Sequence, residues 1–182
     1  GKAVLSSETH NTGTDRIFEV FKNTLKSLPN IIVNLQGDMP NIEPKIIKNL
    51  INYMQQGKCE VGTLASEIKN NFELEDENIV KVLVKEKLKE GIFSEALDFL
   101  RVNPGQNHKT YHHVGIYAFT SIALTKYVSL KRSKLELNRK LEQLRAMENG
   151  MSIHVGYINS SPLSVDTEKD LFRIKKLMEK NE

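Results

Sequence analysis

Short apolar runs alternate with amphipathic segments along this chain of 182 residues. Apolar runs bounded by turn-forming residues predict strands, and apolar residues spaced three and four apart predict helices. Strands are predicted at residues 3–6, 31–35, 61–64, 79–84, 111–119 and 153–158. Helices are predicted at 17–28, 46–54, 137–144 and 171–178. Because strands alternate with helices, the chain is predicted to have an α/β fold with a mostly parallel sheet.

Two boundary features refine this pattern. Thr167 and Asp170 form a weakened capping box in front of the last helix. The acidic run Glu73–Glu77 lies between two predicted strands and is interpreted as a solvated loop. No internal repeat or low-complexity linker divides the sequence, so residues 1–182 are expected to form one domain.

Composition and charge exclude several classes of function. The balance of 26 basic against 23 acidic residues gives a net charge of +3, which favours an anionic ligand. Lys and Arg are dispersed among acidic residues rather than gathered in a stripe, so nucleic-acid binding is not expected. No apolar run reaches the roughly 20 residues of a membrane span. Cys59 is the single cysteine and cannot form an internal disulfide, which fits a cytoplasmic protein.

Two aspartates follow predicted strands, where ligands bind in sheets of this kind. Gly37 allows a sharp turn after the strand at 31–35, so that Asp38 can point at a ligand or a cation. Asp166 lies between a late strand and the last helix. Together they could hold Mg²⁺, which prefers one or two carboxylates with phosphate oxygens and water. The alternatives are a turn aspartate bonding its own backbone and an ordinary helix cap.

Other polar residues are more ambiguous. His108, His112 and His113 do not have a zinc-binding spacing, although a histidine at the start of the strand at 111–119 could bond a ligand hydroxyl or carboxylate. His112 is interpreted as a solvated loop residue. Glu142 and Arg145 could simply pair on the polar face of a helix. No nucleophile elbow, Walker loop or dinucleotide fingerprint is present.

Five segments occur in a distinctive order: TGTDR at 12–16, IVNLQGD at 32–38, HVGIY at 113–117, LEQLR at 141–145 and VDTEKDL at 165–171. Together they resemble the 3-deoxy-manno-octulosonate (Kdo) cytidylyltransferases, and the resemblance runs nearly end to end. It implies a Rossmann-like nucleotidyltransferase fold with a mixed, mostly parallel sheet. The implied reaction joins CTP and Kdo to give CMP-Kdo and pyrophosphate, in a cytoplasmic homodimer that serves lipopolysaccharide synthesis.

The resemblance also implies roles for individual residues. It places Mg²⁺ on Asp38 and Asp166, the sugar on Gln36, His113, Tyr117, Glu142 and Gln143, and the nucleotide near Gly13, Thr14 and Arg16. In such a reaction a sugar hydroxyl attacks the α-phosphate, so catalysis depends mainly on positioning and charge stabilisation.

Three departures from the family pattern qualify this expectation. The family's amino-terminal strand and basic phosphate-binding loop are missing from the sequence given, so the chain is expected to open part-way into its sheet. Met39 follows Asp38 where the family usually has an acidic residue, and Glu95 replaces an arginine. Two alternative hypotheses therefore remain: a related cytidylyltransferase for another sugar, and a non-catalytic truncated homologue that dimerises or binds ligand.

Overall fold

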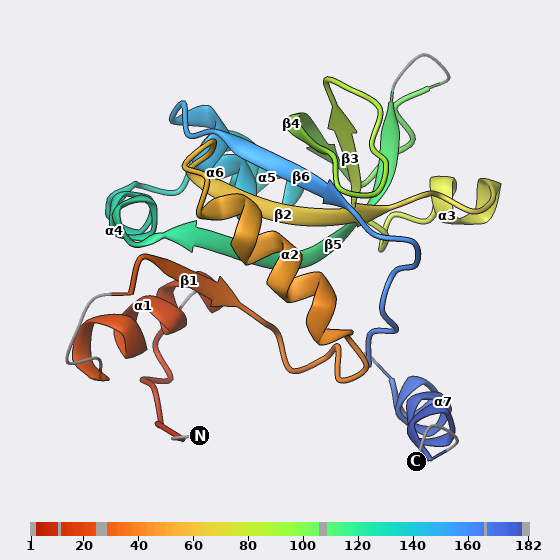
Figure 1. The fold of residues 1–182 in the computed structure, drawn as a ribbon, viewed down its shortest axis with the longest axis horizontal. Helices are drawn as coiled ribbons and strands as arrows, with labels where there is room; N and C mark the ends of the chain where they lie inside the picture. The colour runs from red at the N-terminus through yellow and green to blue at the C-terminus, as the bar shows by residue number, and fades with distance from the viewer. Residues whose placement is uncertain (1–2, 11, 25–28, 106–108, 166, 180–182) are drawn as a thin grey trace.

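The computed structural model describes residues 3–10, 12–24, 29–105, 109–165 and 167–179. Six strands form one mixed sheet in the order β1-β5-β2-β6-β4-β3 (Figure 1). They are β1 (Ile31–Asn34), β2 (Val61–Ser66), β3 (Lys81–Val84), β4 (Phe93–Leu100), β5 (Thr110–Thr120) and β6 (Ile153–Tyr157). Strand β5 is the longest, and it pairs with β1, β2 and β3.

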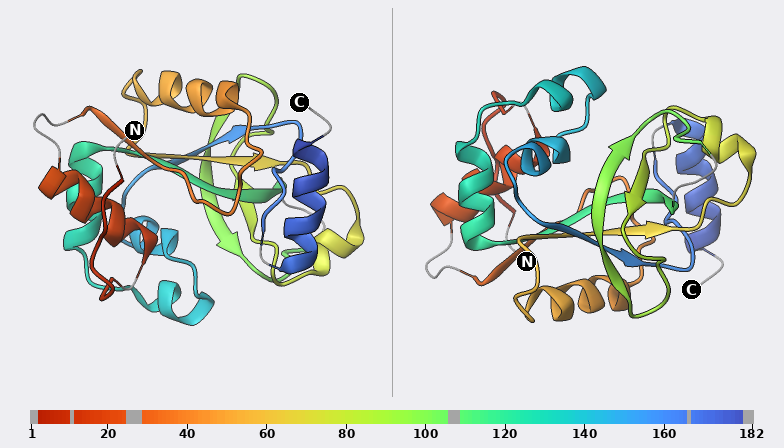
Figure 2. Two further views of the ribbon diagram at one scale, coloured as in Figure 1. Left: turned by 90° about the horizontal axis from the view of Figure 1, so that it is seen from below. Right: turned by 90° about the horizontal axis from the view of Figure 1, so that it is seen from above.

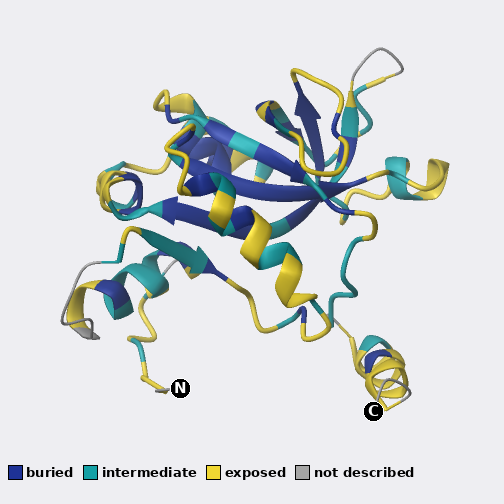
Figure 3. Cartoon of the chain, viewed as in Figure 1, coloured by how far each residue is buried: buried dark blue, intermediate teal, exposed yellow. Residues whose placement is uncertain are grey.

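Helices cover both faces of the sheet. They are α1 (Gly13–Thr24), α2 (Pro44–Met54), α3 (Asn71–Glu75), α4 (Ser121–Ser129), α5 (Lys134–Arg139), α6 (Gln143–Glu148) and α7 (Glu168–Met178). Figure 2 shows α2 on one face and α1, α4, α5 and α6 on the other. Helix α7 stands apart from the sheet and is largely exposed (Figure 3). No helix within the described ranges has both the length and the apolar content to span a bilayer.

Each face of the sheet carries its own apolar cluster. Leu50 and Met54 of α2 pack against one face, where a Cβ added to Gly62 would lie 2.8 Å from both side chains. This close approach of helix and strand is possible because glycine has no side chain. Phe21, Leu124 and Leu144, from α1, α4 and α6, pack against the other face. The central strands are therefore buried on both sides (Figure 3).

The α/β class and the mixed sheet are confirmed, but the sheet is not mostly parallel. Among the strand pairings that the structure describes, only β2 with β6 is parallel. The apolar runs could not predict this, because strands buried on both faces have similar sequences in either orientation.

Three local predictions are wrong. Residues 3–6 form no strand, because no described strand pairs with them. The acidic run at 73–77 is partly helical, since Asn70 caps α3 by accepting a hydrogen bond from the Glu73 backbone. The helix predicted at 137–144 is divided into α5 and α6 at Lys140, which has a left-handed φ of 55°. The leucine spacing continues across this break and therefore conceals it. The capping box of Thr167 and Asp170 is confirmed.

A buried ion pair joins the two helices formed at this break. Arg145 Nη2 lies 2.6 Å from Glu136 Oε1, and both side chains are almost fully buried. Arg132 and the Ser133 backbone also donate hydrogen bonds to the Glu136 carboxylate. Burial alone would raise the pKa of Glu136, but the hydrogen bonds from Arg145, Arg132 and Ser133 outweigh it and lower the pKa.

We expect Glu136→Gln to lower the free energy of unfolding near pH 7 by about 3–5 kcal/mol, because Arg145 would keep a buried charge without its partner. Because the folded pKa of Glu136 is lowered, its stabilisation is present above the unfolded pKa of about 4.3 and is lost in acid. Urea unfolding near pH 7 and near pH 3 measures both effects.

The control for this experiment is Glu86→Gln, which removes an exposed ion pair with Lys109. It should change the unfolding free energy by less than about 1 kcal/mol. Equal losses in the two variants, or a difference that persists in acid, would contradict the role given to the buried pair.

Candidate active site

The turn after β1 is tied to the segment that leads into α7. The backbone amide of Val165 donates to the carbonyl oxygen of Asp38 at 2.9 Å. The hydroxyl of Ser164 donates to Asp38 Oδ2 at 3.2 Å. Asp166 itself lies outside the described residues, but its neighbour in sequence contacts Asp38. These two bonds therefore connect the two segments in which the aspartates were predicted.

The carboxylate of Asp38 is left partly unsatisfied. Its Oδ1 atom is buried and has no hydrogen-bond partner in the structure. A buried carboxylate oxygen without a donor or a cation destabilises the folded protein, so such an atom points to a bound group. Mg²⁺ fits this position because it prefers carboxylate oxygens and completes its shell with phosphate oxygens and water. No cluster of three or more metal-binding side chains exists among the described residues.

A cavity of about 610 Å³ opens beside Asp38. Its walls come from the ends of β1 and β2, the first half of β5 and the segment before α7, and include Gln36, Asp38, Ser66, Lys69, His112, His113, Ser164 and Arg173. The Ser66 hydroxyl is a second buried polar atom without a partner. Lys69 and Arg173 supply positive charge, and Glu73 and Asp76 line the same cavity beside Asp38, so its wall carries both signs of charge.

His113 is buried in this wall as a neutral imidazole. Burial, and to a lesser extent His112, lower its pKa to about 3. Its Nε2 lies 2.9 Å from the hydroxyl of Thr63, which also lies 2.8 Å from the carbonyl oxygen of Ile116. Because the hydroxyl has one proton and donates it to that carbonyl, we assign a proton to Nε2 and a free lone pair to Nδ1. His113 can therefore accept a hydrogen bond but cannot act as a charged acid near neutral pH.

Of the other two histidines considered for a metal site, the structure describes His112. His112 belongs to β5 rather than to a loop, and its Nδ1 lies 3.7 Å from the Glu73 carboxylate. His108 lies outside the described residues. The structure therefore corrects the interpretation of His112 as a solvated loop residue.

Tyr117 and Glu142 form a second polar corner on the same face as His113. The ring centres of His113 and Tyr117 are 5.5 Å apart, so this corner lies next to the part of the cavity wall that His113 forms. Glu142 Oε1 accepts a hydrogen bond of 3.1 Å from Thr14, whereas the buried Oε2 has no partner. Burial raises the pKa of Glu142, and burial together with the nearby Glu142 charge raises that of Tyr117. Gln143 lines the same corner.

Tyr127 of α4 contacts the residues behind this corner. Its hydroxyl donates to the backbone carbonyl of Glu142 at 2.9 Å, and the Arg145 guanidinium lies 4.6 Å from the centre of its ring. Since Arg145 is held by Glu136, the buried ion pair fixes the start of α6. The sequence alone favoured a polar helix face with a Glu142–Arg145 pair, and gave no signal for Tyr127.

The predicted nucleotide residues divide into two groups. Thr14 contacts Glu142, and a Cβ on Gly13 would lie 4.0 Å from Gln36 Nε2, so the start of α1 adjoins the predicted sugar residues. Arg16 points elsewhere: its guanidinium bonds the Ser6 hydroxyl and the backbone of Ser7. The structure thus does not bring Arg16 together with the other predicted residues.

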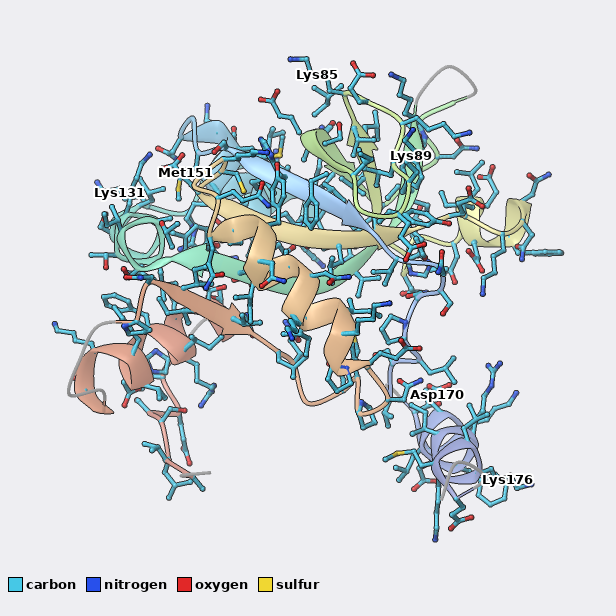
Figure 4. The ribbon with its side chains drawn as sticks, in the orientation of Figure 1. Lys85, Lys89, Lys131, Met151, Asp170 and Lys176 are labelled. Carbon is cyan, nitrogen blue, oxygen red and sulfur yellow. The ribbon has the colours of Figure 1, made fainter. Side chains whose placement is uncertain are left out.

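The two residues that depart from the family pattern, Met39 and Glu95, lie at the edge of these polar clusters or outside them. Met39 lines the cavity but packs its side chain into the core beneath α2. Glu95 is exposed on β4 and pairs with Lys85 at 3.5 Å. Figure 4 shows Lys85 at the opposite side of the molecule from Asp170 of α7. The reversed charge at Glu95 is therefore balanced locally by Lys85.

Comparison with known proteins identifies the family. Residues 1–153 match the family model described as "Cytidylyltransferase". The 3-deoxy-manno-octulosonate cytidylyltransferase of Paramagnetospirillum magneticum is 38% identical over 180 residues, which cover 98% of this chain and 73% of the relative. The enzyme of the same name from Bartonella tribocorum is 37% identical over 177 residues, covering 96% of this chain and 72% of the relative.

A solved structure agrees with these relatives. CMP:2-keto-3-deoxy-manno-octonic acid synthetase, solved in complex with CTP, superposes with a TM-score of 0.88 at 32% identity. The match covers 100% of this chain and 74% of the solved one. The resemblance read from the five sequence segments is therefore confirmed. The chain belongs to the cytidylyltransferase family of nucleotidyltransferases, among the 3-deoxy-manno-octulosonate cytidylyltransferases.

Proposed function

We propose that this protein transfers the cytidylyl group of CTP to Kdo, giving CMP-Kdo and pyrophosphate. The observation that carries the proposal is the unpartnered carboxylate oxygen of Asp38, in a cavity shared with Gln36 and His113. The relatives described above are named as cytidylyltransferases of Kdo. The solved structure is of a synthetase named for CMP and the same sugar acid, in complex with CTP. In the reaction, a sugar hydroxyl oxygen bonds the α-phosphorus while the bond to pyrophosphate breaks.

The residues of the chain would act mainly by binding and orientation. A polyhydroxylated sugar could form hydrogen bonds with Gln36, Glu142 and Gln143. A sugar without the matching hydroxyl groups would leave these side chains unpaired and would bind more weakly. The free Nδ1 of His113 would accept a hydrogen bond from a sugar hydroxyl. Lys69 and Arg173 are the cationic side chains of the cavity wall that would pair with the anionic groups of the substrates.

Asp38 is the described residue that would hold Mg²⁺, with Asp166 as its proposed partner. When bound, the ion would neutralise phosphate charge and orient the reacting groups. Asp38 is held in place for this role by Ser164 and Val165.

We also propose that the protein is a cytoplasmic homodimer that supplies an activated sugar acid for lipopolysaccharide synthesis. These features rest on the family resemblance. The buried free thiol of Cys59 is compatible with a reducing compartment. Light scattering coupled to size-exclusion chromatography would measure the mass in solution, and a monomer would contradict the dimer.

For the metal role, Asp38→Asn in the complete protein should lower turnover at least about a hundredfold, because it removes a carboxylate charge that binds the ion. The Mg²⁺ concentration for half-maximal rate should also rise. A pyrophosphate-release assay with CTP and Kdo measures both. Glu86→Gln is the control, because Glu86 is an exposed carboxylate outside the cavity lining. Undiminished release by Asp38→Asn would refute the assignment.

For Glu142, we expect substitution by Gln to increase stability and weaken sugar binding. A raised carboxyl pKa means that stability is full below the unfolded pKa and declines as pH rises through the folded pKa. The buried charge therefore destabilises the free protein at neutral pH, and the neutral isostere removes this cost. Thermal unfolding should show a higher Tm, while the KM for Kdo rises about tenfold or more. A lower Tm with an unchanged KM would contradict the assignment.

The imidazole of His113 should stay neutral between about pH 5 and pH 8, since burial lowers its pKa to about 3. Nitrogen NMR of protein labelled at histidine, with His113→Gln to assign the signal, tests this. A His113 signal that titrates in this range would show that the ring becomes charged and can act as an acid.

A further inference from the structure

Asn34, the last residue of β1, has a buried side chain with an unused donor. The residue is 4% exposed, and its Nδ2 atom is buried without a hydrogen-bond partner. Buried amide groups in folded proteins almost always have a partner, because an unpaired donor loses its hydrogen bonds to water and gains nothing. An orphan donor at the end of β1, which lies at the edge of the described sheet, therefore points to a group that binds there.

The position of Asn34 in the sheet places its side chain beside Tyr117 and the start of α1. It is paired with Tyr117 in the antiparallel register of β1 and β5, so both side chains lie on the same face. On the same side, a Cβ on Gly13 would lie 3.8 Å from Asn34 Nδ2 and 4.0 Å from Gln36 Nε2. The amides of Asn34 and Gln36 therefore both face the start of α1.

The same corner contains an orphan acceptor. Thr14, next to Gly13, bonds one carboxylate oxygen of Glu142, while the buried Oε2 is unpaired. An unused N–H donor and an unused carboxylate oxygen together suit a ligand with hydroxyl groups, which accept and donate hydrogen bonds. A phosphate suits this corner poorly, because the Glu142 carboxylate would repel it in a buried setting.

We propose that Asn34 is a specificity-determining residue that donates a hydrogen bond from Nδ2 to an oxygen of the acceptor sugar. The proposal rests on the function proposed above and adds a residue to its sugar site. It also explains why an unpaired amide is retained: the ligand supplies the partner that the folded chain lacks.

The test is the effect of Asn34→Leu on stability and on substrate binding in the complete protein. Leu has a similar size but no donor, so the free protein should gain about 2 °C in Tm. The KM for Kdo should rise about tenfold, while the KM for CTP stays the same. Asn52→Leu is the matched control, because it makes the same change on the exposed surface of α2 and should alter neither KM.

The outcomes distinguish a sugar contact from a purely structural role and from a nucleotide contact. A lower Tm with an unchanged KM for Kdo would mean that the amide is structural, and would overturn the proposal. A change in the KM for CTP alone would place Asn34 at the nucleotide and overturn it as well.

Failure of the proposed function would be visible in the unaltered protein, as an absence of pyrophosphate release from CTP and Kdo. Calorimetric titration with Kdo would still decide the role of Asn34 in that case. Weaker binding by Asn34→Leu supports the proposal, whereas equal binding, or no binding by either protein, overturns it.

Discussion

Strand β5 imposes the constraint on which both the sheet and the site depend. Its backbone pairs with β1 and β2 on its two sides, and its first residues also pair with β3. A strand in this position must bury both faces, and it does so beneath α2 on one side and beneath α1, α4 and α6 on the other (Figure 2). Its register with β1 brings Asn34 opposite Tyr117, and the ring of His113 contacts that of Tyr117 on the same face. A shift of one residue would move these side chains to the other face.

The polar groups on this face have contrasting hydrogen-bond states. Next to the site, Arg145 donates two hydrogen bonds to Glu136, and Tyr127, which contacts Arg145, bonds the backbone of Glu142 at the start of α6. Within the site, Asn34, Asp38 and Glu142 each retain a buried polar atom without a partner. The paired groups stabilise the folded chain, whereas the unpaired ones destabilise it until a ligand binds. This division is consistent with a rigid support that holds a binding surface ready for its substrates.

The sequence predicted most helices and strands correctly. It predicted a strand before Asp38 and the capping box before α7, because both follow from local residue order, but β1 is only partly buried at the edge of the described sheet. It failed at Lys140, where a left-handed residue divides a continuous leucine pattern, and at strand direction, which apolar runs do not encode. The support from Tyr127 and the orphan amide of Asn34 gave no signal, since both depend on residues distant in the chain.

The sequence by itself therefore determined the α/β class, the order of the segments and, through its resemblance to a known family, the chemistry expected of them. Only the tertiary structure decided which side chains meet and what charge they carry. The bond between Asp38 and Val165, the neutral state of His113 and the raised pKa of Glu142 all arise from burial and from contacts across the fold. Burial and long-range contacts are properties of packing, so residue order alone could not reveal them.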